Sequence, residues 1–174
     1  GELEQVSGWA RDALVQDQKI SQAAQRYRYM QQSVVLGRGY NYATAFEWAL
    51  KLKELTYVAA EPYSSADFKH GPVAMVESGF PVFAISPKGK VFDSMQNMLK
   101  HLKNDLRAEL VVVSNSLAAL ELAEIAIPIP ENTPEWLTPL ISIIPAQLFA
   151  YHLTLAKGYD PEQPRTITKV TETH

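Results

Sequence analysis

Two glutamates and a lysine stand at helical spacing in the stretch FEWALKLKELTY, residues 46–57. At about 100° per residue, Lys51 lies one turn after Glu47 and one turn before Glu54, so the three side chains can meet. Most such helix charges are structural. The alternative is an acid held in an apolar pocket, where burial raises a carboxylate pKa and a neighbouring cation lowers it. A glutamate poised in this way can transfer a proton next to a carbonyl.

The helix expected over residues 42–56 has two apolar faces. One stripe carries the acids among apolar residues: Ala43, Phe46, Leu50 and Tyr57. The second face is formed by Trp48, Leu52 and Leu55. This pattern favours a helix that packs on a sheet and also against a partner.

A strand, a glycine turn and a helix start follow one another in VVLGRGYNYATA. Gly37 and Gly39 would let the backbone approach an anion at the helix N-terminus, with Arg38 between them. The segment is not a dinucleotide fingerprint, because Tyr42 occupies the place of the third glycine. A plain turn and a turn with a bound ligand fit the pattern equally well.

Two more residues are candidates for chemistry. His70, in SSADFKHGP, precedes a Gly-Pro pair that ends a helix, so it can act as acid or base at a chain reversal. The alternative is a surface loop histidine. Lys169 lies in the polar tail, where it can form an imine with a sugar carbonyl or simply be solvated.

Strand and helix patterns alternate along the chain. Short Val- and Ile-rich runs predict strands at 34–37, 81–86, 110–114 and 125–129, with a weaker candidate at 57–60. Helices are expected at 42–56, 91–107, 116–123 and 135–157, after an amphipathic helix within the first 30 residues. The alternation predicts an α/β fold with a parallel sheet, whose ligands bind at the carboxyl ends of strands.

The composition excludes several classes of protein. The chain has 174 residues, a formal net charge of -3 and no cysteine. It offers no basic footprint for nucleic acid or an anionic membrane, and no disulfide or thiolate metal site. The apolar segment from Trp136 to Ala156 is broken by Pro139 and Pro145, so we expect a buried core helix. A reducing cytoplasm fits these features.

Taken together, the motifs resemble the sugar isomerase (SIS) domain family. The likeness covers residues 33–169 and rests on E-x-x-L-K-x-K-E, on K-H-G-P, and on Q-P-R with a lysine shortly after it. It is strongest to the second SIS domain of two-lobed members that act on fructose 6-phosphate. It implies a three-layer α/β/α sandwich with a five-stranded parallel sheet, flavodoxin-like, and a homodimer.

The resemblance also implies roles for the candidate residues. Glu54 resembles the glutamate that moves a proton between C1 and C2 during aldose–ketose isomerisation. His70 resembles the histidine that opens the sugar ring, which in the family comes from the neighbouring subunit. Lys169 resembles the tail lysine that forms a Schiff base with the ketose. No metal or organic cofactor is implied.

The remaining positions of the motifs match residues that, in the family, neighbour these catalytic groups. Lys51 and Glu47 match the lysine and the acid that precede the catalytic glutamate. Arg165 matches the arginine of Q-P-R. Residues 1–32 are then an N-terminal helix, 33–158 the SIS domain, and 159–174 a tail that closes on the active site.

One departure from the family pattern concerns the phosphate. The family's loop S-x-S-G-x-T has no match here, and Ser86-Pro87-Lys88-Gly89 occupies the analogous place without those hydroxyls. We therefore expect the chain to be the C-terminal lobe of a longer protein whose N-terminal SIS lobe holds the phosphate.

The reaction stays open among three alternatives. The same residues serve isomerisation or amination of fructose 6-phosphate to glucosamine 6-phosphate through an enediol or enediolamine. The ending KVTETH is more like SIS-type deaminases and deglycases. A module that senses a sugar phosphate without catalysis is a third possibility, although such a module would be expected to have lost the Glu, His and Lys set.

Overall fold

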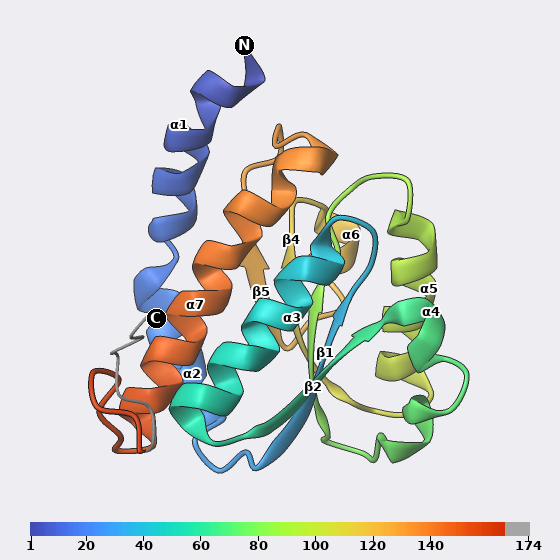
Figure 1. Cartoon of the computed structure of the whole chain (residues 1–174). Helices are drawn as coiled ribbons and strands as arrows, with labels where there is room; N and C mark the ends of the chain where they lie inside the picture. Colours follow the sequence, from blue (N-terminus) through green and yellow to red (C-terminus); the bar gives the residue numbers. More distant parts are fainter. Residues whose placement is uncertain (166–174) are drawn as a thin grey trace, which may run out of the picture.

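Five parallel strands form the centre of the computed structural model, which describes residues 1–165 (Figure 1). The strands are β1 Gln32–Gly37, β2 Ala59–Ser64, β3 Pro81–Ile85, β4 Glu109–Ser114 and β5 Ile125–Pro128. Their order is β2-β1-β3-β4-β5 and every pairing is parallel. The predicted α/β/α sandwich with a five-stranded parallel sheet is confirmed. The strand order reverses between β1 and β3, which in such sheets is where a crevice opens for ligands.

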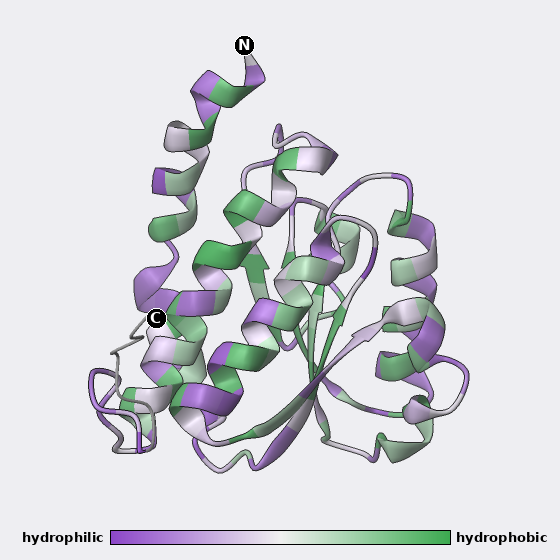
Figure 2. Ribbon diagram, in the orientation of Figure 1, coloured by the Kyte–Doolittle hydropathy of each residue, from purple (hydrophilic) through white to green (hydrophobic). Residues whose placement is uncertain are grey.

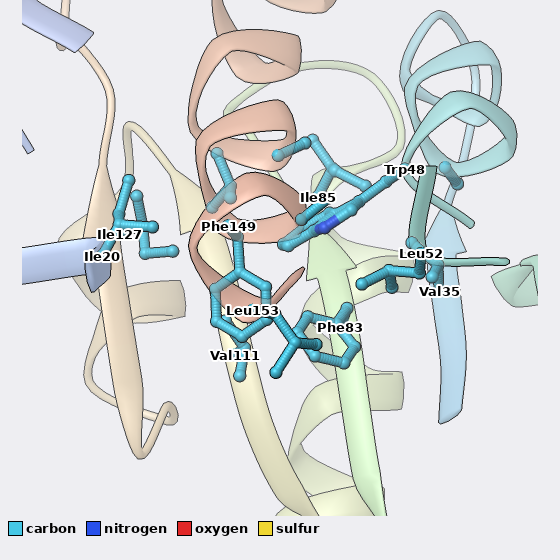
Figure 3. Packing of buried hydrophobic residues seen from close by; sticks show 14 of the residues in the cluster. Ile20, Val35, Trp48, Leu52, Phe83, Ile85, Val111, Ile127, Phe149 and Leu153 are labelled. Atoms are coloured by element: carbon cyan, nitrogen blue, oxygen red, sulfur yellow. The ribbon is translucent and has the colours of Figure 1, made fainter. Parts of the chain in front are cut away.

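Four helices lie on one side of the sheet, and the first of them packs on the last rather than on the strands. They are α1 Glu2–Leu14, α2 Asp17–Arg26, α3 Asn41–Lys51 and α7 Thr138–Ala156, the last preceded by the 3-10 turn η3 Glu135–Leu137. Between them and the strands lies an aromatic core (Figure 3). The Phe83 ring lies 5.0 Å from both the Trp48 and Phe149 rings, centroid to centroid, in edge-to-face contacts.

Shorter helices cover the other face. They are α4 Ser65–Phe68, the 3-10 turn η2 Pro72–Met75, α5 Phe92–Asn104 and α6 Leu117–Leu120. Because side chains alternate along a strand, Val34 and Leu36 of β1 belong to this second core while Val35 belongs to the first. The sheet thus separates two packed layers.

Four predicted elements differ from the structure. The helix expected at 116–123 is only the single turn α6, Leu117–Leu120. The N-terminal segment is two helices, α1 and α2, separated at Val15 and Gln16. The strand expected at 57–60 is β2, which begins at Ala59 and runs to Ser64. The helix expected over 42–56 is α-helical only to Lys51 and continues as the π-helix η1, Leu52–Thr56.

Helix α7 lies in the core layer, as expected. By length and composition alone the stretch Glu135–Ala156 is apolar enough to cross a membrane. In the fold it packs on α1, α2 and α3, and it buries Phe149 and Leu153 completely. Burial of this kind is typical of a core helix.

The two apolar faces predicted for α3 have different surroundings. Trp48 and Leu52 are fully buried against the sheet and α7. On the outward side, Phe46 is 51% and Leu50 is 42% exposed, and hydrophobic turns alternate with hydrophilic ones along the ribbon (Figure 2). Contact of this outward stripe with a partner stays a prediction.

Candidate active site

The predicted charge cluster forms at the end of α3. Lys51 Nζ lies 2.8 Å from Glu54 Oε2 and 3.7 Å from Glu47 Oε1. The hydrogen bond to Glu54 raises the pKa of Lys51; partial burial opposes this and the charge of Glu47 adds to it. The lysine is therefore the protonated centre of a three-residue cluster.

The cluster is more exposed than the apolar-pocket alternative requires. The side chains of Lys51 and Glu54 are each 30% exposed, and that of Glu47 is 35% exposed. The reason is that the acids lie on the outward stripe of the helix, beside Phe46 and Leu50 rather than in the core. Solvent or a partner molecule can therefore reach Glu54.

Glu54 lies within a π-helical turn. Thr56 Oγ1 donates to the carbonyl of Leu52 at 2.6 Å, and Tyr57 then ends the turn with a left-handed backbone at φ 59°. A non-glycine residue in this region is uncommon and costly unless its surroundings hold it. π-Helical turns occur frequently at functional sites.

The tail packs against the end of this turn. The ring of Tyr57 lies 5.0 Å from that of Tyr159, and the Arg165 guanidinium stands 4.3 Å from the Tyr57 centroid. The Arg165 backbone N–H also donates to the Tyr57 hydroxyl at 2.9 Å. Arg165 is thereby held against Tyr57, which follows Glu54 by three residues. Lys169 lies outside the described residues.

Gly37 and Gly39, at the end of β1, are each required by the backbone for a different reason. A Cβ on Gly37 would lie 2.3 Å from the Asn41 carbonyl oxygen, so only glycine lets α3 start this close to β1. Gly39 has φ +59°, which glycine adopts without strain. Both observations explain the glycines without a ligand, and their substrate-binding role stays a prediction.

His70 and Arg38 lie together in a different place. Both line a hollow of about 770 Å³, and His70 is exposed in the turn between α4 and η2. Arg38 follows β1 and donates through Nη1 to Ser94 Oγ of α5. The structure thus brings His70 and Arg38 to the same hollow.

Glu54 and His70 do not meet within the described part of one chain. Glu54 lies just before β2 starts, at the amino ends of the strands and on the side of the sheet that α3 covers (Figure 1). His70 lies beyond the carboxyl end of β2, on the side covered by α4 and α5. The separation arises because β2, Ala59–Ser64, runs from one end of the sheet to the other between the two residues.

Sequence reasoning missed several residues near both sites. His101 lines the hollow with His70, as do Ser94 and Asn97. Asn97 and His101 follow Ser94 by three and seven residues, a spacing that predicts one shared face of α5. The pairing of Tyr57 with Tyr159 had no such sign, because the two residues are far apart in sequence.

Comparison with known proteins shows what the chain is similar to. A family model described as the SIS domain matches residues 30–157. The chain is 34% identical over 97% of its length to glutamine–fructose-6-phosphate aminotransferase [isomerizing] of Bacteroides thetaiotaomicron, of which it covers 27%. It is 37% identical over 97% of its length to the protein of the same name from Thermococcus kodakarensis, covering 28%. The chain therefore spans about a quarter of the length of these curated relatives.

Solved structures agree with the fold. The C-terminal domain of glucosamine-fructose-6-phosphate aminotransferase from Francisella tularensis has a TM-score of 0.85 and 31% identity, covering 93% of this chain and 46% of that chain. The tagatose-6-phosphate ketose/aldose isomerase from Escherichia coli has a TM-score of 0.81 at 23% identity, covering 97% and 47%. The second likeness is one of fold alone.

Proposed function

This chain belongs to the SIS domain family, and on that premise we propose that it is the C-terminal SIS lobe of a phosphosugar aldose–ketose isomerase/aminotransferase. The substrate is fructose 6-phosphate. Glucosamine 6-phosphate is the product, or the substrate of the reverse reaction. The relatives' names support this substrate class, since they are aminotransferases of fructose 6-phosphate. A cytoplasmic location and a homodimer are part of the proposal.

The observation that carries the proposal is the contact between Lys51 and Glu54. The carboxylate of Glu54 takes a proton from one of the two carbons C1 and C2 while the carbonyl oxygen or imine nitrogen gains a proton, which leaves an enediol or enediolamine. It then returns its proton to the other carbon, while the hydroxyl or amine that becomes the new double bond loses one. No electrons leave the substrate. Lys51, 2.8 Å away, stabilises the carboxylate before the proton is taken and again after it is returned. Partial exposure of Glu54 supports access for a substrate.

The tail contact supports the role proposed for Lys169. Arg165 is held against Tyr57, three residues beyond Glu54. Lys169 follows Arg165 by four residues, a stretch of chain that spans at most about 14 Å. Its amine can attack the ketose carbonyl, and loss of water then gives the imine.

The rest of the active site would come from outside this chain. The separation of Glu54 from His70 supports a second subunit as the source of the ring-opening histidine. The short coverage of the relatives supports an N-terminal SIS lobe as a further part of the protein. That lobe would hold the substrate phosphate beside Glu54.

The test is Glu54→Gln in the full-length protein. We expect isomerase turnover to fall by at least about 100-fold, the usual contribution of a general base, while sugar-phosphate binding survives. Glu121→Gln is the matched control, because Glu121 is exposed at the end of α6. Unchanged turnover in Glu54→Gln would rule out the proton-transfer role.

Product analysis distinguishes the alternatives. Fructose 6-phosphate and glucosamine 6-phosphate are each supplied with and without ammonia or glutamine. Ammonia release from glucosamine 6-phosphate as the main reaction would favour a deaminase, and binding without turnover would favour a sensor. Borohydride trapping with fructose 6-phosphate tests Lys169, and the absence of an adduct on its peptide would defeat the imine step.

A further inference from the structure

Tyr57 joins the turn that carries Glu54 to the edge strand β2. Its backbone has φ 59° and ψ 22°, a left-handed conformation that glycine or asparagine adopts at lower steric cost than tyrosine. The residues on either side of it, Thr56 and Val58, are each only 1% exposed, so their packing holds this conformation. The reason for a tyrosine at this position therefore lies in the contacts of its side chain.

The end of α7 fixes the position of Tyr159. The N–H of Gly158 donates to the Leu155 carbonyl at 2.9 Å. The N–H of Tyr159 donates to the Thr154 carbonyl at 3.0 Å. Gly158 has φ +77°, so these features form the Schellman motif that commonly ends a helix. Because α7 packs on the turn η1, this cap brings the Tyr159 ring to 5.0 Å from the Tyr57 ring, centroid to centroid.

Arg165 contacts both of these rings. Its guanidinium lies 4.3 Å from the centroid of Tyr57 and 5.1 Å from that of Tyr159, distances at which a cation is attracted to an aromatic ring. Its backbone N–H donates to the Tyr57 hydroxyl at 2.9 Å. Tyr57 thus holds Arg165 through two contacts of different kinds, one to the side chain and one to the backbone. We call Tyr57, Tyr159 and Arg165 the tail clamp.

The tail clamp contributes little to the stability of the fold but lies close to the proposed chemistry. Arg165 is exposed and Tyr57 is half-buried, and contacts of charged groups at the surface stabilise a fold weakly. The clamp joins the tail to the turn that carries Glu54, three residues before Tyr57. Catalysis is more sensitive to such placement than stability is, because a displacement of about 1 Å costs up to about 100-fold in rate.

We propose that Tyr57 is a positioning residue of the isomerase reaction, which holds residues 159–165 against the turn η1 and so sets the placement of the tail beside Glu54. The inference rests on the proposed function and adds to it the residue that couples the tail to the catalytic turn. Tyr57 transfers no proton and forms no bond with the sugar. Its hydroxyl and its ring act through Arg165, and its backbone acts through the end of the turn.

Two substitutions in the full-length protein separate the contacts of the clamp. Tyr57→Phe removes the hydroxyl but keeps the ring, and Arg165→Ala removes the guanidinium but keeps the backbone N–H. Each should lower the isomerase kcat by about two- to tenfold, the loss of one hydrogen bond or one exposed cation–π contact. The double variant should lose more than either. In Tyr57→Phe the KM for fructose 6-phosphate should stay within about twofold, because the hydroxyl binds the tail and not the substrate. Tyr29→Phe is the matched control, because Tyr29 is an exposed tyrosine that follows α2.

Hydrogen exchange measures the clamp directly and needs no substrate. In Tyr57→Phe the amide of Arg165 should exchange about two- to tenfold faster, as followed by mass spectrometry of the peptide that contains it, because its acceptor is gone. The melting temperature should stay close to that of the wild type. Unchanged exchange would overturn the clamp, and faster exchange with an unchanged kcat would overturn its positioning role. Failure of the proposed function would appear separately, as turnover that survives Glu54→Gln, whatever the exchange of the tail.

Discussion

Lys51 contacts two carboxylates unequally. Its ammonium is a hydrogen-bond donor to Glu54 at 2.8 Å, whereas Glu47 lies at 3.7 Å, beyond a normal hydrogen bond. The nearer acid is therefore the main reason that the pKa of Lys51 is raised. The unequal distances make Glu54 the partner of the lysine and Glu47 a more distant neighbour.

Replacement of Glu54 should change the titration of Lys51. We expect Glu54→Gln to lower the pKa of Lys51, and Glu47→Gln to lower it less, as measured by NMR titration of the lysine side chain. Because the folded pKa is raised, the pair's contribution to stability is present below the unfolded lysine pKa and is lost as pH rises through the folded value. At neutral pH it amounts to about 0.2–1 kcal/mol for a pair this exposed. Equal shifts in the two variants would contradict the assignment.

The start of α3 is fixed by its contact with β1. Gly37 ends the strand, and the first turn of the helix places the Asn41 carbonyl where a Cβ would be. This turn sets the position of Arg38 and the direction of the helix that leads to Glu54. The close approach is backbone against backbone, so it cannot be relieved by a side-chain rotation.

Gly37→Ala should destabilise the fold by about 1–3 kcal/mol through this overlap. The same substitution at Gly8 should stabilise it by about 0.5–1 kcal/mol, because Gly8 is exposed within α1 and no atom would meet the new Cβ. Urea unfolding of both variants measures the difference. Similar midpoints for the two would contradict the steric argument.

Elements were predictable where one physical rule dominates. The runs of β3 and β4 are buried on both faces, so continuous Val and Ile marked them. The edge strand β2 contains Glu61 and Pro62, which an edge tolerates, and its bounds were therefore misplaced. The turn at Leu52–Thr56 has no local signature, since five residues are too few to tell a π-helix from an α-helix by periodicity.

The contacts of the candidate site also fall into two kinds, those that sequence spacing predicts and those that only the fold brings about. The contacts of Lys51 followed from spacing along one helix. The contact of Arg38 with Ser94 and that of Tyr57 with Arg165 join residues far apart in sequence, so only the fold reveals them.

On the scale of the molecule, the proposed catalytic set is divided. Glu54 and His70 lie on opposite sides of the sheet and at opposite ends of its strands, and β2 joins them along the chain (Figure 1). A rigid sheet cannot bring them together. An active site that uses both residues therefore needs two copies of this chain, each giving one residue to a shared site.

Subunit mixing tests this arrangement. Full-length Glu54→Gln and His70→Ala are each expected to be inactive. When equal amounts are mixed and allowed to exchange subunits, half the dimers are mixed, and each has one site with both native residues and one with neither. Turnover should then recover to about a quarter of the wild-type value, as two-fold symmetry requires. The double variant mixed with wild type is the control: exchange should lower its turnover from about half to about a quarter. If both residues served one chain's own site, the first mixture would stay inactive and the second would not change, because no exchange could reunite or separate them.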